Sequence, residues 1–295
     1  MEFLEILKIV LLGIVEGITE WLPVSSTGHM RLIDELFTLK SSEAFNDMFF
    51  VVIQLGAILA VVATFFKKLF PLKIERNGQP NSDGTVAPKN KLVADMDILN
   101  LWLKVIIACL PAAVIGLVLE LTDVEKYLEQ PIIIALALII YGVAFILIEK
   151  RNEKRELPIK TTADISYKKA LIIGAFQVLS LIPGTSRSGA TILGALLIGI
   201  DRPAGSEFTF FLAIPVMLGA SALKMLMFFI DGNTLGGAET GYLLIGMAVA
   251  FGVSMLAIKF LMNFVKKHSF TAFGWYRIAL GALVIGAIVI PSLIG

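Results

Sequence analysis

The stretch that decides the fold is residues 131–148, which read PIIIALALIIYGVAFILI. It holds no charged residue, and as a helix its 18 residues would extend about 27 Å, because an α-helix rises about 1.5 Å per residue. That length nearly matches the hydrocarbon core of a bilayer, which is about 30 Å thick. The stretch therefore predicts a membrane-spanning helix.

Further apolar stretches of similar length lie along the chain. They cover residues 49–66, 99–119, 208–230, 242–262 and 278–294. The chain of 295 residues is 57% hydrophobic and 17% charged, whereas a soluble domain is about half apolar and a quarter charged. We therefore predict an all-α, polytopic membrane protein with about six transmembrane helices, folded as one integral membrane domain over residues 1–295.

The charged residues gather between these stretches, and the sign of the charge alternates. The connections 67–98 and 149–169 are rich in lysine and arginine, whereas 120–130 and 231–240 are mainly acidic. Connections with an excess of basic residues stay in the cytoplasm. The pattern therefore makes 67–98 a cytoplasmic loop. A soluble protein with very buried helices would not confine its charges in this way.

The charge balance and the cysteine content narrow the classes of function. A net charge of +1 gives no argument for nucleic-acid binding. The single cysteine, Cys109, lies in an apolar stretch and is typical of a small packing residue. We therefore expect no nucleic-acid partner and no internal disulfide.

Two other apolar regions are interrupted by polar residues and proline. Residues 6–33 contain Glu16, Glu20 and Pro23, and residues 170–200 contain the run PGTSRSG at 183–189. Each half of each region is too short to cross a bilayer alone. We therefore predict two re-entrant helix pairs, whose irregular backbone must be buried in protein or line a wet cavity.

The two interrupted regions also resemble each other. Residues 13–16, Gly-Ile-Val-Glu, match 174–177, Gly-Ala-Phe-Gln, and residues 22–26 parallel 182–186 after a shift of one residue. Traced from the basic loops, the regions begin on opposite sides of the membrane. A match of this size also arises by chance, but interrupted segments at matching places are typical of inverted-topology repeats with a shared site near the midplane. The predicted halves are residues 1–130 and 131–295.

The first interrupted region carries candidate catalytic groups. Glu16 and Glu20 are four residues apart, so they share one face of a helix. Carboxylates in apolar segments are costly and usually face a functional cavity, although an interfacial segment would also explain them. Ser25 and Ser26 follow, and serines at such places commonly cap the next helix. With His29 close by, however, the region supplies a nucleophile, a base and an acid.

The second interrupted region is typical of an anion site. Small residues surround Arg187 and precede an apolar helix, so backbone N–H groups can turn toward a ligand at a helix N-terminus. The guanidinium group adds a planar fork of donors that suits phosphate oxygens. An arginine that only reaches toward the membrane surface is the alternative. Together the two regions predict a phosphate site that faces a nucleophile.

These two regions carry long motifs that resemble one known family. Residues 16–29 read EGITEWLPVSSTGH, and residues 183–191 read PGTSRSGAT. Both resemble the motifs of undecaprenyl-diphosphate phosphatases, also called bacitracin-resistance proteins. The resemblance implies a multi-pass enzyme of the bacterial plasma (inner) membrane whose active site opens to the outer, periplasmic face. Its reaction would convert undecaprenyl diphosphate to undecaprenyl phosphate and inorganic phosphate, which recycles the lipid carrier for peptidoglycan synthesis and gives bacitracin resistance.

The resemblance also implies roles for individual residues and for partners. The catalytic candidates are Glu16, Glu20, Ser26, His29 and Arg187, with Thr27 as a second hydroxyl candidate. The substrate-binding candidates are Ser25, Thr27, Gly184, Thr185, Ser186, Ser188 and Gly189. A divalent cation, Mg²⁺ or Ca²⁺, is expected at Glu16 and Glu20. The expected partners are the isoprenoid diphosphate substrate and membrane lipid, and a homodimer remains open.

The expected mechanism starts with attack of Ser26 on the terminal phosphorus while Glu20 takes the proton and Arg187 stabilises the phosphoryl charge. Glu16 would share a cation or tune Glu20, and His29 would donate to the leaving oxygen. Direct attack by water remains an alternative. A lipid transporter or flippase is one rival, because such repeats are typical of transporters, and an intramembrane serine hydrolase is another. Transport requires no nucleophile, however, and a serine hydrolase requires no arginine.

Overall fold

The structure is a computed structural model, and it describes residues 2–37, 39–76, 90–120, 122, 128 and 130–289. Helices predominate in these residues, beside a single two-stranded hairpin. The long helices are α6 Met96–Glu120, α8 Pro131–Asn152, α11 Arg202–Ile230 and α12 Gly237–Phe264, and α3 Glu43–Val52 and α4 Gln54–Thr64 together form one further long segment. The prediction of an all-α fold is therefore confirmed.

Within the described residues, five helical segments are long and apolar enough to cross a bilayer. They are Glu43–Thr64, Met96–Leu119, Pro131–Asn152, Arg202–Ile230 and Gly237–Phe264. The prediction of a multi-pass membrane protein is therefore confirmed. The sixth predicted span, 278–294, overlaps the shorter helix α13 Thr271–Val284 and a π-helical continuation at Ile285–Val289, and its last residues lie outside the described part of the chain. The count of six spans thus stays a prediction.

The two interrupted regions form pairs of shorter helices. Their bounds are α1 Phe3–Thr19, α2 Ser26–Leu36, α9 Tyr167–Val178 with a 3-10 turn at Leu179–Leu181, and α10 Arg187–Leu197. We call residues 20–25 the first break loop and residues 182–186 the second. Each contains a proline, Pro23 or Pro183, which lacks an N–H donor and drives the preceding residue out of the helical region.

Both break loops end in the same backbone conformation. Ser25 and Ser186 have positive φ angles of 76° and 69°. Each serine caps the following helix, because its Oγ accepts a hydrogen bond from the N–H of the glycine three residues on, Gly28 or Gly189. The counterpart of Ser186 is therefore Ser25. The predicted shift of one residue pairs Ser186 with Ser26 instead, and it does not match these two caps.

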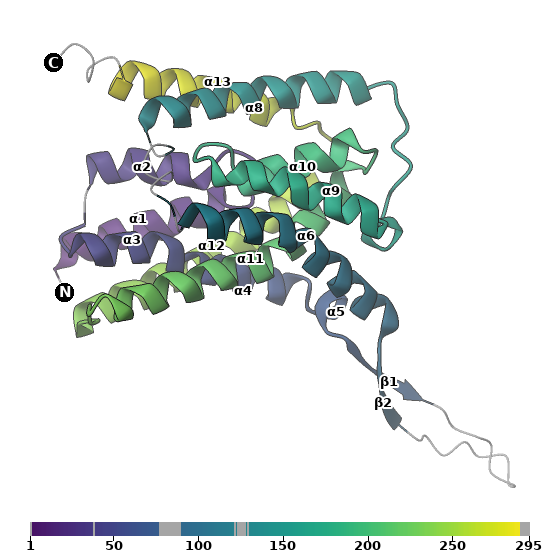
Figure 1. The fold of residues 1–295 in the computed structure, drawn as a ribbon, viewed down its shortest axis with the longest axis horizontal. Helices are drawn as coiled ribbons and strands as arrows, with labels where there is room; N and C mark the ends of the chain where they lie inside the picture. Colours follow the sequence, from purple (N-terminus) through teal and green to yellow (C-terminus); the bar gives the residue numbers. More distant parts are fainter. Residues whose placement is uncertain are drawn as a thin grey trace, which may run out of the picture.

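Three pairs of helices that are distant or non-adjacent in sequence pack closely, and two of these pairs join the first half of the chain to the second. α1 packs against α12, α9 against α6, and α8 against α13, and the last pair runs side by side at one edge of the molecule (Figure 1). Glycines allow close approach: a Cβ at Gly174 would lie 2.2 Å from the backbone oxygen of Ala108, and one at Gly142 would lie 2.7 Å from that of Gly274. This interlocking brings the two break loops into contact.

The basic loop 67–98 contains regular structure at its ends. A short helix α5 Phe66–Leu69 is followed by strand β1 Leu72–Arg76, which pairs antiparallel with β2 Asn90–Ala94, with Leu72 opposite Ala94. The hairpin extends beyond the helices (Figure 1). The middle of the predicted cytoplasmic loop, residues 77–89, lies outside the described residues.

Candidate active site

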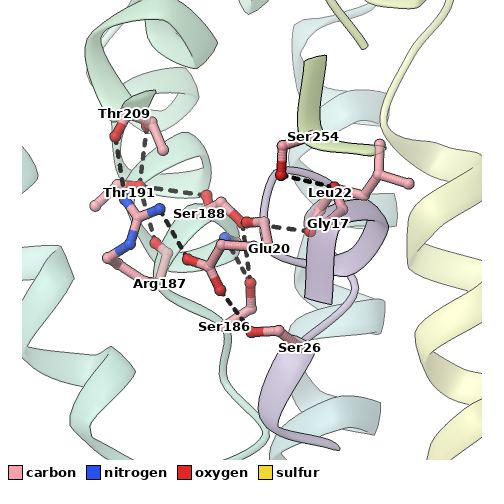
Figure 2. Close-up of polar contacts among 11 residues, drawn as sticks. Gly17, Glu20, Leu22, Ser26, Ser186, Arg187, Ser188, Thr191, Thr209 and Ser254 are labelled. Carbon is pink, nitrogen blue, oxygen red and sulfur yellow. Dashed lines mark hydrogen bonds and ion pairs between the residues drawn. The ribbon is translucent and has the colours of Figure 1, made fainter. Parts of the chain in front are cut away.

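A single carboxylate joins the two break loops. Arg187 Nη2 donates to Glu20 Oε1 at 3.0 Å, and Ser26 Oγ donates to Glu20 Oε2 at 2.6 Å. Figure 2 shows the three side chains converging from the first break loop and from the starts of α2 and α10. The ion pair is nearly closed to solvent, since the side chain of Arg187 is 10% exposed and that of Glu20 is 7% exposed. The structure thus brings together three of the predicted catalytic residues.

Local backbone structure places each of these side chains. Glu20 follows the last residue of α1, and its N–H still bonds to the carbonyl oxygen of Glu16. Ser26 and Arg187 are the first residues of α2 and α10. Both therefore lie at helix N-termini, where the unpaired N–H groups and the helix dipole favour negative charge. A phosphate group beside both residues would meet two positive helix ends.

Neighbouring polar groups hold the network in place. Ser188 Oγ lies 3.1 Å from the backbone oxygen of Glu20 and 3.3 Å from that of Leu22, so it ties α10 to the first break loop. Arg187 Nη1 donates to the carbonyl oxygen of Thr209 in α11 at 3.1 Å (Figure 2). The guanidinium group also lies 5.9 Å from the ring centre of Trp21. These contacts restrict the rotamer of Arg187 and leave its charge directed at Glu20.

Glu16 lies one turn before Glu20 and is 1% exposed. Its Oε1 atom is buried and has no hydrogen-bond partner among the described residues. It interacts electrostatically with both Glu20 and Arg187. A buried carboxylate oxygen without a partner is costly. Among the described residues, Glu16 thus keeps one carboxylate oxygen unpaired, whereas both carboxylate oxygens of Glu20 are bonded.

His29 lies beside the network but does not bond to it. Its Nδ1 atom lies 2.7 Å from the carbonyl oxygen of Ser25, and its Nε2 atom lies 2.6 Å from the hydroxyl of Tyr276 in α13. A carbonyl only accepts, so Nδ1 carries a proton, and in a neutral ring Nε2 accepts from Tyr276. The predicted contact of His29 with a leaving group would require Nε2 to exchange Tyr276 for that group. Thr27, the second hydroxyl candidate, is exposed.

Some of the predicted anion-binding residues around the second break loop are already hydrogen-bonded to each other, whereas another is unpaired. The Oγ of Ser186 accepts from the N–H of Gly189, so these two groups cap the helix. Gly184 adopts a φ of +89°, and a Cβ there would lie 2.5 Å from the backbone oxygen of Ile134, so only glycine fits. Thr185 is fully buried, and its Oγ1 has no partner among the described residues. Thr185 Oγ1 is thus a free polar group next to the site.

Sequence reasoning missed two residues of the last helix. Tyr276 contacts His29, and Arg277 donates to carbonyl oxygens of both break loops. The available signal was a charged residue in an apolar segment, since Arg277 directly precedes the stretch from residue 278. Such residues usually have a partner in the protein interior. The partner itself could not be named from sequence.

The arrangement is suited to phosphoryl transfer. A serine hydroxyl bonds at short distance to a carboxylate that can accept its proton, and a guanidinium group bonds to the same carboxylate. These are the nucleophile, base and charge-stabilising group that such a transfer requires. In the described residues, no group of three or more His, Cys, Asp or Glu side chains is placed to hold a metal ion. Among the described residues, side chains of these four types therefore supply at most two ligands to any one ion.

Comparison with known proteins gives matches over nearly the full length. The model of a family described as bacitracin resistance protein BacA matches residues 9–283. An undecaprenyl-diphosphatase of Enterococcus faecalis is 58% identical over 285 residues, which are 97% of this chain and 98% of the relative. Undecaprenyl-diphosphatases of Streptococcus thermophilus and Lachnoclostridium phytofermentans are each 51% identical, over 96% and 97% of this chain and 93% and 98% of the relatives.

Proposed function

The chain belongs to the BacA family of bacitracin resistance proteins, and on that premise we propose that it is an undecaprenyl-diphosphatase. It hydrolyses undecaprenyl diphosphate to undecaprenyl phosphate and inorganic phosphate. Full-length relatives at 51% to 58% identity carry that name. The observation that carries the proposal is the contact of Ser26 and Arg187 with the same carboxylate, Glu20. A flippase would need an anion site, but it would not need a serine bonded to a buried base.

The terminal phosphate binds between the N-termini of α2 and α10. Arg187 faces this position with a fork of donors that can bond to two phosphate oxygens. To bond to the phosphate, Arg187 Nη2 weakens its hydrogen bond to Glu20 Oε1. The Glu20 carboxylate is then free to act as a base. The isoprenoid chain of the substrate stays in the hydrocarbon core of the bilayer, because moving its apolar groups into water would cost free energy.

Ser26 then attacks the terminal phosphorus in line with the bridging oxygen. Its proton moves to Glu20, the Oγ–P bond forms, and the bond from phosphorus to the bridging oxygen breaks, which releases undecaprenyl phosphate. Glu20 passes this proton to the leaving phosphate or to solvent, so the carboxylate is regenerated. It then takes a proton from water, whose oxygen bonds to phosphorus; the Oγ–P bond breaks, inorganic phosphate leaves, and Glu20 returns the proton to Ser26 Oγ. Water attacking directly is the alternative course, and trapping a phosphoserine separates the two.

His29 is the proposed acid for the leaving oxygen; because Nε2 of the neutral ring accepts from Tyr276, it donates a proton only from the doubly protonated ring. The leaving group is a phosphate, which is a stable anion, so protonation adds less to the rate than it would for an alkoxide. The bond of Nε2 to Tyr276 agrees with a limited role of this kind. We therefore expect substitution of His29 to reduce turnover less than substitution of Ser26.

Glu16 and Glu20 would hold a divalent cation. The partnerless Oε1 of Glu16 supports this assignment, because carboxylate oxygens suit hard cations. Two carboxylates with water and substrate phosphate oxygens are a usual set for Mg²⁺, whereas Ca²⁺ takes six to eight oxygens. When bound, the cation would neutralise charge on the phosphate oxygens.

We also propose that the two halves form an inverted repeat with the site open to the outer face of the plasma membrane. The matching caps at Ser25 and Ser186 support the repeat. The basic connections 67–98 and 149–169 support the orientation, since they would lie in the cytoplasm. A Thr27→Cys, Cys109→Ala variant tests the orientation. Its cysteine should react with a membrane-impermeant thiol reagent in intact cells as well as in opened cells.

The test of function is phosphate release from undecaprenyl diphosphate by the purified protein in lipid nanodiscs. Wild-type protein should release phosphate, and Ser26→Ala and Arg187→Ala should not. Undiminished release by both variants would refute the assignments. Lipid translocation in vesicles without phosphate release would instead favour the flippase.

A further inference from the structure

Arg277 in α13 bonds to both break loops at once. Its Nη1 donates to the carbonyl oxygen of Pro23 at 3.1 Å, and its Nη2 donates to those of Gly184 and Thr185, both at 2.8 Å. Pro23 lies in the first break loop, whereas the other two residues lie in the second. The side chain is completely buried. One guanidinium group therefore connects two loops that are about 160 residues apart in sequence.

The bonding pattern of Arg277 is unusual for a buried arginine. No carboxylate of the described residues forms an ion pair with it, and its charge is balanced by three carbonyl dipoles and by the ring of Tyr141, 5.5 Å away. Where a helix is interrupted, carbonyl oxygens lose the N–H donors that would follow them. Arg277 supplies those donors, so its binding partner is the loop backbone itself.

The carbonyls that Arg277 binds lie close to the reacting groups. Pro23 precedes Ser26 by three residues, and Thr185 precedes Arg187 by two. A Cβ at Gly189, in the first turn of α10, would lie 3.1 Å from Arg277 Nη1, so the guanidinium group also packs against that turn. A shift of either loop would therefore move Ser26 relative to Arg187. Misplacement by about 1 Å can cost about 10²-fold in rate.

We propose that Arg277 is a positioning residue for the phosphatase reaction, because it holds the two break loops at the separation at which Ser26 and Arg187 share Glu20. The effect on rate rests on the proposed function, whereas the effect on the loops does not. Lysine should not replace it fully. An ammonium group is a compact donor without the planar fork that reaches acceptors on two loops.

The test compares Arg277→Lys and Arg277→Ala with wild type in nanodiscs. We expect kcat for undecaprenyl diphosphate to fall about 10²-fold in both variants, with KM changed by less than about 3-fold, because the phosphate-binding side chain remains. Hydrogen exchange measured without substrate should rise in both break loops. Free guanidinium ion should restore part of kcat in Arg277→Ala, and methylammonium should not.

Arg202→Ala is the matched control. Arg202 also binds a buried group, since it donates to both carboxylate oxygens of Glu149, and among the described residues none of its hydrogen bonds or ion pairs reaches a break loop. We expect a kcat near that of wild type, no rescue by guanidinium, and increased exchange only around α8 and the start of α11. A purely structural loss of an arginine that pairs with a buried carboxylate would behave in this way.

Three outcomes would overturn the proposal. They are a wild-type kcat in Arg277→Lys, a fall in kcat while both loops keep wild-type exchange, and loss of folded protein in both variants, which would assign Arg277 to folding alone. If the wild-type protein released no phosphate from undecaprenyl diphosphate, the proposed function would instead be refuted. In that case the exchange measurements would still decide whether Arg277 holds the loops together.

Discussion

Replacing Arg187 by methionine breaks the buried ion pair with Glu20, so it should lower both stability and activity. The two groups are 3.0 Å apart, and their side chains are 10% and 7% exposed. Breaking one partner of a buried pair costs about 3–5 kcal/mol, because the other charge is left without compensation. Glu20 keeps its bond from Ser26, so we expect a loss near the lower end, about 3 kcal/mol.

The double variant Arg187→Met, Glu20→Gln separates stability from catalysis. It removes both charges, so no charge is left without its partner. Its free energy of unfolding should therefore be about 2 kcal/mol higher than the value expected if the losses of the two single variants simply added. Phosphate release should not recover. A charge-stabilising arginine in phosphoryl transfer contributes about 10³- to 10⁵-fold in rate, and the proposed base is also absent.

The assay measures reversible unfolding in mixed micelles and phosphate release in nanodiscs for wild type, both single variants and the double variant. Lys68→Met serves as control. Lys68 pairs with Glu207 at 2.6 Å, but its side chain is 58% exposed, so the loss should stay below about 1 kcal/mol with activity kept. The reasoning fails if the double variant is no more stable than additivity predicts, or if activity returns together with stability.

Three other predictions concern the caps, the cation and the packing. Ser26→Ala should abolish phosphate release, whereas Ser25→Ala should lose about 1 kcal/mol of stability through the missing cap and keep measurable release; equal release by both would contradict the choice of nucleophile. Removal of divalent cations by a chelator should stop phosphate release, and added Mg²⁺ should restore it. The Glu16→Gln variant should need a higher Mg²⁺ concentration, and full activity after chelation would exclude a role for the cation in the reaction. Gly174→Ala should lower the melting temperature, because its Cβ would lie 2.2 Å from a backbone oxygen of α6 and overpacking costs about 1–3 kcal/mol; Gly219→Ala, where nothing lies within 4 Å, should not.

Sequence alone determined the features that depend on local composition. Runs such as 131–148 indicated membrane helices, because burying apolar residues in hydrocarbon needs only length and hydropathy. Pro23 and Pro183 indicated the helix breaks, because proline acts on its own backbone and that of its neighbour. The charged and hydroxyl residues of the motifs were also identified, since such groups are rare in apolar segments.

Tertiary structure alone decided which of these groups meet. Glu20 contacts Arg187 across 167 residues of sequence, and this contact depends on how α1 packs against α12 and α9 against α6. His29 shows the limit of spacing as a guide: it lies three residues after Ser26, yet its ring bonds to Tyr276, 247 residues away. Arg277 was missed because its acceptors are backbone carbonyls, which every residue carries and no sequence pattern marks. Helix periodicity and proline act over a few residues, whereas the separation of the break loops is set by long-range packing, and that separation makes the site.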